Sequence, residues 1–120
     1  MNGAAIAAKN STPVDTSVLA HLLGNNDPKQ LREMLNMYLD TESDVPAALR
    51  KLIQERNGAG LAQAAHAAKG AAASAGARRL AEIYKELELC GAKEDWETIE
   101  KLAFQIDPTF EEVRKFIHAL

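Results

Sequence analysis

Glycine and proline are scarce in this sequence, with seven and four copies in 120 residues. Few residues are therefore suited to tight turns, and much of the remainder is Ala, Leu, Glu and Lys, which favour helices. Hydrophobic residues make up 47% and charged residues 26%, which is ordinary for a globular protein. The length suits one compact domain with a single core. These properties predict an all-α protein.

Features that mark several other classes of protein are also missing. A single cysteine, Cys90, excludes an internal disulfide and is typical of a reducing compartment. The formal net charge is −3 and no basic run occurs, so nothing favours binding to nucleic acid. The start of the chain has no basic region and only a weak apolar run, which excludes a signal peptide, and no stretch is apolar enough to span a membrane. We therefore expect a cytoplasmic protein without membrane insertion.

The hydrophobic pattern predicts one short helix followed by longer ones. Asp15 caps the short helix and Gly24 ends it. Apolar residues then recur at steps that keep them on one side of a helix. The long helices are expected at residues 28–55, 59–75, 77–90 and 93–119. Long amphipathic helices with short links predict an antiparallel four-helix bundle with a short additional N-terminal helix.

Two prolines lie inside these predicted helices. Pro46 and Pro108 each remove a backbone hydrogen bond and kink the helix. The apolar stripe stays in phase across both, so we expect residues 28–55 to form one long kinked helix. Residues 1–13 mix small and polar types without a period, which predicts a flexible N-terminal arm and places the folded domain at residues 14–120.

Three large apolar residues widen the inward face of the helix expected at 28–55. They are Met34, Met37 and Leu39. We interpret them as additional core. The alternative is a rim on which a partner docks.

The helix expected at 59–75 carries an unusual outward face. An outward face normally holds long charged side chains, but here small residues surround a histidine. The face consists of Ala59, Ala62, Gln63, His66, Lys69, Gly70 and Ala73. His66, Lys69 and Gly70 lie at i, i+3 and i+4, so they are neighbours on it. A glycine in mid-helix costs about 1 kcal/mol relative to alanine, which indicates that something approaches the backbone closely at Gly70.

The residue pattern leaves few kinds of chemistry open at this face. A metal site is poorly supported, because there is no Glu-x-x-His pair or Cys/His cluster, and His21, His66 and His118 lie on three different helices. A hydrolytic site is also poorly supported, because Ser74, a candidate nucleophile, lies two turns from His66. The imidazole itself can act as a nucleophile toward a phosphoryl group, with Lys69 as a nearby cation. An ordinary surface histidine is the alternative.

The run His66-Ala67-Ala68-Lys69-Gly70 resembles the signature of histidine-containing phosphotransfer (HPt) domains, as do Gly76-Ala77, Leu80 and Leu87-Glu88 after it. In that family the pattern is approximately His-x-Leu-Lys-Gly-Ser, then Gly-Ala, then Leu, then a Leu-Glu pair. Residues 23–28 are similar to the Gly-x-Asp-Pro opening common before the second helix. The resemblance covers nearly the whole chain.

The sequence departs from the family pattern at two positions. Ala68 stands in place of the usual leucine, and Ala71 in place of the usual serine. Neither is a reacting group, so the resemblance still implies the family's fold and activity.

The resemblance also implies a role for each residue that matches. His66 would take a phosphoryl group on its outer ring nitrogen from an aspartyl phosphate of a response-regulator receiver, and pass it to another receiver. Lys69 would help neutralise that group. Glu88 would hydrogen-bond the other ring nitrogen and fix the tautomer; its alternative is a solvated carboxylate at a helix end. The receiver would dock on Ala62, Gln63, Gly70 and Ala73.

The implied partners are receiver domains and a hybrid sensor histidine kinase. The chain would be a carrier rather than an autonomous enzyme, and it is expected to be a monomer. It would need no cofactor or metal of its own, because the receiver supplies Mg²⁺. Two alternatives stay open: an HPt domain phosphorylated directly by a histidine kinase, and a non-catalytic helical interaction module.

Overall fold

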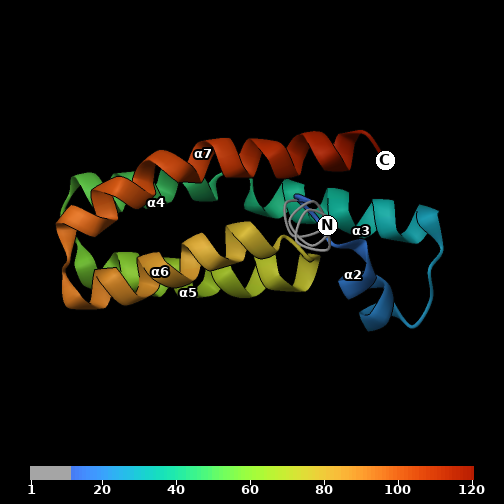
Figure 1. The fold of residues 1–120 in the computed structure, drawn as a ribbon, viewed down its shortest axis with the longest axis horizontal. Helices are drawn as coiled ribbons and strands as arrows, with labels where there is room; N and C mark the ends of the chain where they lie inside the picture. The colour runs from blue at the N-terminus through green and yellow to red at the C-terminus, as the bar shows by residue number, and fades with distance from the viewer. Residues whose placement is uncertain (1–11) are drawn as a thin grey trace, which may run out of the picture.

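A computed structural model describes residues 12–120, and every regular element in this range is an α-helix (Figure 1). The helices are α2 (Thr16–Leu23), α3 (Pro28–Glu42), α4 (Val45–Gln54), α5 (Gly58–Ala75), α6 (Arg78–Lys93) and α7 (Trp96–His118). The all-α prediction is confirmed. Most of the predicted arm at residues 1–13 lies outside the described residues. Within them, no helix is long and apolar enough to cross a membrane.

The long helices run antiparallel in a bundle (Figure 1). Helices α5 and α6 form an extensive pair, and α7 packs against α6 and α4. Helices α3 and α4 follow one another along α7, so together they take the place of one bundle helix (Figure 1). The short helix α2 packs on α5 and α3 at one end. This arrangement is the predicted four-helix bundle with a short additional N-terminal helix.

The expected single helix over residues 28–55 is wrong, because the chain divides there into α3 and α4. The break falls at Ser43 and Asp44. Pro46 is buried in the first turn of α4, and its ring leaves no room for a regular helical turn on the carbonyl of Glu42. Ser43 and Asp44 keep helical backbone angles, so α4 continues in roughly the direction of α3. Pro108, in contrast, lies within the continuous helix α7, as predicted.

Helix α6 extends past its predicted end at residue 90. Gly91, interpreted from the sequence as a terminator, lies inside the helix and is buried. Glycine stands at this position because of the contact between two helices: a Cβ at Gly91 would stand 3.0 Å from the carbonyl oxygen of Gly58 on α5. Glu94 adopts the left-handed conformation that ends the helix instead. Asp95 then caps α7, which begins at Trp96 rather than at 93.

Apolar residues from every helix form one core. Its largest fully buried aliphatic side chains are Leu35, Leu49, Leu61, Leu80, Leu87, Ile99, Ile106 and Ile117. Helix α5 contributes Ala65, Ala68 and Ala72, whose small side chains let its neighbours approach closely.

The core interpretation of the three large apolar residues on α3 holds for only one of them. Leu39 is buried, but Met34 is 39% exposed and Met37 is 60% exposed. At 100° per residue, Leu35 and Tyr38 occupy the centre of the inward face, and Met37 lies well to one side of it. The two methionines therefore form an apolar rim at the surface.

The N-terminal segment is tied to the corner between α5 and α6. Asp15 caps α2 through Ser17 and donates its backbone N–H to the carbonyl of Gly76 at 2.8 Å. Gly76 has φ +83°, and a Cβ there would collide with the carbonyl oxygen of Asp15. Only glycine fits both the backbone angle and the space at this corner. This contact places α2 beside the C-terminal half of α5.

Candidate functional site

His66 stands on the outward face of α5, near the middle of the helix. The side chain of Asn57 caps the helix by accepting from the N–H of Gly60 at 2.8 Å. Ala65 and Ala68 face the core, which turns His66 outward. The imidazole is 67% exposed. An outside molecule can therefore reach it directly.

Glu88 of α6 joins His66 and Lys69 of α5 through one carboxylate. Its Oε2 lies 2.9 Å from Nδ1 of His66, and the Nζ of Lys69 donates to its Oε1 at 2.8 Å. The side chains of Glu88 and Lys69 are only 27% and 31% exposed. These three residues, which we call the His66 cluster, are separated by up to 22 positions in sequence.

The partner of Nδ1 determines which ring nitrogen of His66 keeps a free lone pair. The hydrogen bond to Lys69 lowers the pKa of Glu88 most, and His66 lowers it further, against an opposing effect of partial burial. The carboxyl is therefore ionised and only accepts hydrogen bonds. The hydrogen between Glu88 and His66 belongs to Nδ1, so in the neutral ring Nε2 carries the free lone pair.

The residues predicted to receive a docking partner lie around His66. Gln63, Gly70 and Ala73 are exposed, and Ala62 is half-buried. A Cβ built on Gly70 would meet nothing within 4 Å. The packing of this chain thus gives no reason for glycine at that position. The structure brings these residues onto one face with the His66 cluster, as the helical spacing predicts.

An apolar groove lies between α3, α2 and α5, on the flank of the same face. Met34 and Met37 line it from α3, while Ala71 and Ser74 line it from α5. On α2, Leu22 is 63% exposed and borders a second hollow together with Ala73. Exposed apolar side chains near His66 therefore extend beyond α5 onto α3 and α2. The wide apolar stripe of α3 is the sequence feature that corresponds to this groove.

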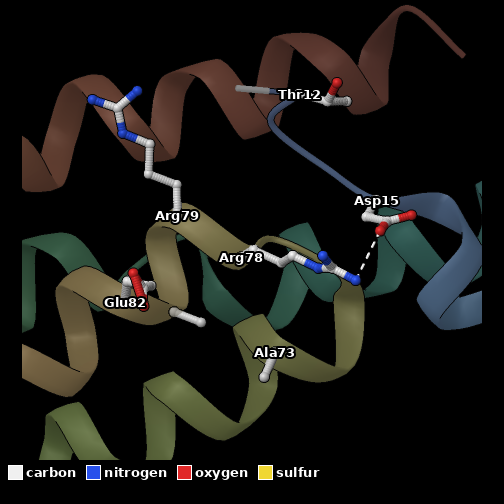
Figure 2. Close-up of a pocket in the computed structure, with 7 residues that line it drawn as sticks. Thr12, Asp15, Ala73, Arg78, Arg79 and Glu82 are labelled. Carbon is white, nitrogen blue, oxygen red and sulfur yellow. Dashed lines mark ion pairs between the residues drawn. The ribbon is translucent and has the colours of Figure 1, made fainter. Parts of the chain in front are cut away.

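A further pocket lies where the N-terminal segment passes the start of α6 (Figure 2). Arg78 points at Asp15 and forms an ion pair with it at 2.9 Å, while Arg79 points away (Figure 2). The rest of the lining consists of Thr12, Ala73, Ala81 and Glu82. No feature of the sequence indicated this pocket. Its central ion pair fastens the N-terminal segment to the bundle.

The remaining histidines stay apart from the His66 cluster. His21 is exposed on α2, and His118 contacts Arg114 in the last turn of α7. Within residues 12–120, no three His, Cys, Asp or Glu side chains gather in a way that could hold a metal ion. Cys90 is a half-buried free cysteine, and burial raises the pKa of its thiol.

Comparison with solved structures finds a similar fold in another protein. The crystal structure of histidine-containing phosphotransfer protein B from Pseudomonas aeruginosa PAO1 has a similar fold, with a TM-score of 0.79. The two chains share 24% sequence identity over 91% of this chain and 94% of the other. No curated protein sequence matches.

A family model gives the assignment more directly. The model described as "Hpt domain" matches residues 33–120. This range contains every member of the His66 cluster and nearly the whole bundle from α3 to α7. The chain therefore belongs to the Hpt domain family.

Proposed function

We propose that this Hpt domain is a phosphorelay intermediate: His66 accepts a phosphoryl group from an aspartyl phosphate of one receiver and passes it to the aspartate of another. Membership of the family gives the chain a role in histidine phosphotransfer. The observation that carries the finer proposal is the contact between Glu88 and Nδ1 of His66. This contact leaves Nε2, on an exposed ring, as the nucleophile.

Phosphoryl transfer between two proteins requires a close and in-line approach of the reacting atoms. They must come within about 3–3.5 Å of each other. The small residues beside His66 allow a receiver to bring its aspartate that near. Gly70 is open to solvent, and Ala73 and Ala62 carry only a methyl group. A long side chain at any of these positions would hold the two surfaces apart.

Lys69 supplies the positive charge next to the transferred group. An ammonium has three N–H donors, and one of them is bound to Glu88. The others remain for phosphoryl oxygens. Because the side chain is only 31% exposed, its charge is less screened than that of a fully solvated lysine.

The receiver would dock on the residues around His66 and on the methionine rim of α3. The first group consists of Ala62, Gln63, Gly70 and Ala73. Met34 and Met37 add flexible apolar side chains, which can adapt to more than one partner. Docking on two different receivers is what a relay intermediate needs.

The partners follow from the same proposal. The donor would be the receiver of a hybrid sensor histidine kinase, and the acceptor a response regulator. The domain would act as a monomeric, cytoplasmic carrier without kinase activity of its own. It would need no cofactor, because the Mg²⁺ for transfer would be held by the receiver.

The proposal is tested by incubating the chain with a phosphorylated receiver and Mg²⁺. The chain should become labelled, and His66→Gln should abolish the label. His21→Gln is the matched control, because His21 is also an exposed helical histidine. Labelling that survived in the His66 variant would contradict the proposal. Labelling only by a kinase with ATP, without any receiver, would support direct phosphorylation instead.

A further inference from the structure

Two tyrosine hydroxyls are buried in the core of the bundle without a hydrogen-bond partner. Tyr38 of α3 is 8% exposed, and Tyr84 of α6 is 1% exposed. Neither hydroxyl bonds to any donor or acceptor among residues 12–120. A buried hydroxyl that loses water and gains no partner destabilises the fold, so such groups are rare in native proteins. Phenylalanine at either position would avoid this cost, which indicates that the hydroxyls have something to bond.

The two tyrosines reach the centre of the core from opposite corners of the bundle. Helix α6 packs on α5 and α7, whereas α3 packs on α7, α5 and α2. The two helices are therefore diagonal to each other rather than adjacent. Both tyrosines belong to the single hydrophobic core. Long side chains that point inward from diagonal helices meet near the bundle axis, away from solvent.

The charges that act on the tyrosines agree with this placement. Burial raises the pKa of Tyr38, and the charge of Glu42 raises it further. Burial is also the main cause of the raised pKa of Tyr84, and Tyr38, Glu42 and Asp107 add to it. Because such effects fall off with distance, the two phenols lie in one region of the core, with Glu42 near both. Glu42 is half-buried, and burial raises the pKa of its carboxyl.

Helix α5 leaves room at the level of Tyr84. This tyrosine lies one turn before Glu88, whose carboxylate accepts from Lys69. Since α5 and α6 are antiparallel, Tyr84 lies opposite the turn of α5 that follows Lys69. The core residue in that turn is Ala72, which is fully buried. Its methyl group fills much less of the centre than Leu61 does near the start of the helix, so a molecule as small as water can be accommodated.

We propose that a buried water molecule bridges the hydroxyls of Tyr38 and Tyr84 and connects α3 to α6 through the centre of the bundle. A tyrosine hydroxyl can both donate and accept, and so can water, so one molecule can bond to both phenols. Internal waters make about two to four hydrogen bonds to protein groups. The carboxyl of Glu42, which acts on both tyrosines, supplies a third acceptor on the solvent side.

The bridge would fix α3 at the place where the helix is interrupted. Helix α3 ends at Glu42 and α4 begins at Val45, so the backbone hydrogen bonds of one helix do not continue into the other. Apolar packing is not directional, whereas a hydrogen-bonded water fixes both distance and angle. The water would thus hold α3, which carries Met34 and Met37, in one position. The inference concerns the folded chain alone and is independent of phosphoryl transfer to His66.

Urea unfolding of Tyr38→Phe, Tyr84→Phe and the double variant tests the bridge by the sign of the effect. Each single substitution should lower the equilibrium constant for folding about fivefold, because the water loses a partner. The double variant should lose less than the product of the two, since both hydroxyls hold the same molecule. Dry hydroxyls would give the opposite sign, because removing an unpartnered group stabilises the chain. Single variants at least as stable as the wild type would therefore overturn the inference, and so would losses that multiply.

Relaxation dispersion of ¹⁷O detects the water itself. This measurement responds to water molecules that stay in the protein, and exchanging hydroxyl protons do not disturb it. The wild type should show a long-lived water that the double variant lacks. Thr41→Val is the matched control, because this hydroxyl of α3 already donates to backbone carbonyls of its own helix, and the water should remain. Equal dispersion in the wild type and the double variant would overturn the inference, as expected if the two hydroxyls bonded each other directly. Loss of the water in Thr41→Val would overturn it too.

Discussion

Gly58 of α5 and Gly91 of α6 pack directly against each other through their backbones. A Cβ at Gly58 would stand 2.6 Å from the carbonyl oxygen of Gly91, closer than real Cβ atoms approach. Both residues are buried. This contact brings α5 and α6 close together one turn beyond Glu88. The short distance between the helices is what lets the Glu88 side chain reach His66 and Lys69.

Gly91→Val should therefore disturb both stability and the site. The added side chain would press on the backbone of Gly58 and Ala62, and overpacking of this kind typically costs about 1–3 kcal/mol. Urea unfolding would measure the loss of stability, and NMR of the imidazole would report the contact between His66 and Glu88. Wild-type stability together with an intact contact would contradict the role given to the glycine pair.

Gly70 gives the opposite expectation for stability. Nothing lies within 4 Å of a Cβ at this position, so Gly70→Ala should stabilise the chain by up to about 1 kcal/mol. Gly70→Arg should also fold, but it should slow phosphotransfer from a receiver by roughly tenfold or more, equivalent to about 1.4 kcal/mol. Thermal unfolding and transfer kinetics on both variants separate the two effects. Unchanged transfer in the arginine variant would argue against close approach at this position.

Met37 provides a test of the rim on α3. The side chain is 60% exposed, so Met37→Asp should change stability by no more than about 0.5 kcal/mol. The charge should nevertheless weaken receiver binding several-fold, because it replaces apolar docking surface. Titration calorimetry with the receiver would measure this.

The control for the rim is Phe104→Asp. Phe104 is 83% exposed on α7, a helix that packs mainly against α6, α4 and α3. This variant should bind the receiver as the wild type does. Equal weakening by both substitutions would mean that the rim has no special part in docking.

The direction of the pKa shift of Glu88 determines how its contribution to stability changes with pH. Its pKa is lowered from the ordinary 4.5, with the hydrogen bond from Lys69 as the largest cause. The contribution of this group to stability is therefore present above pH 4.5 and is lost as pH falls through the lower pKa of the folded state. Lys69→Met should raise the pKa of Glu88, seen in a ¹³C titration of its carboxyl carbon. Lys101→Met, a replacement on α7, should leave it unchanged.

The sequence pattern predicted most features of the individual helices. The periodicity of apolar residues predicted the helices and the core face of α5, and the spacing of His66, Lys69 and Gly70 placed them on one outward face. The pattern could not foresee the break at Ser43 and Asp44, because an in-phase stripe does not show whether a proline interrupts the helix. Met37 at the surface was missed because apolar character alone does not report burial.

The bundle class and the face that carries His66 could be predicted from the sequence alone, since both depend on the repeat of 3.6 residues per helical turn. Which residues meet across helices depends instead on how the helices pack. Glu88 was a candidate only through resemblance, and its contact with His66 depends on the register of α6 against α5. The packing of Gly58 on Gly91, two residues 33 positions apart, is one of the contacts that set this register. Local periodicity carries no information about such a contact, because it arises only when separate helices pack.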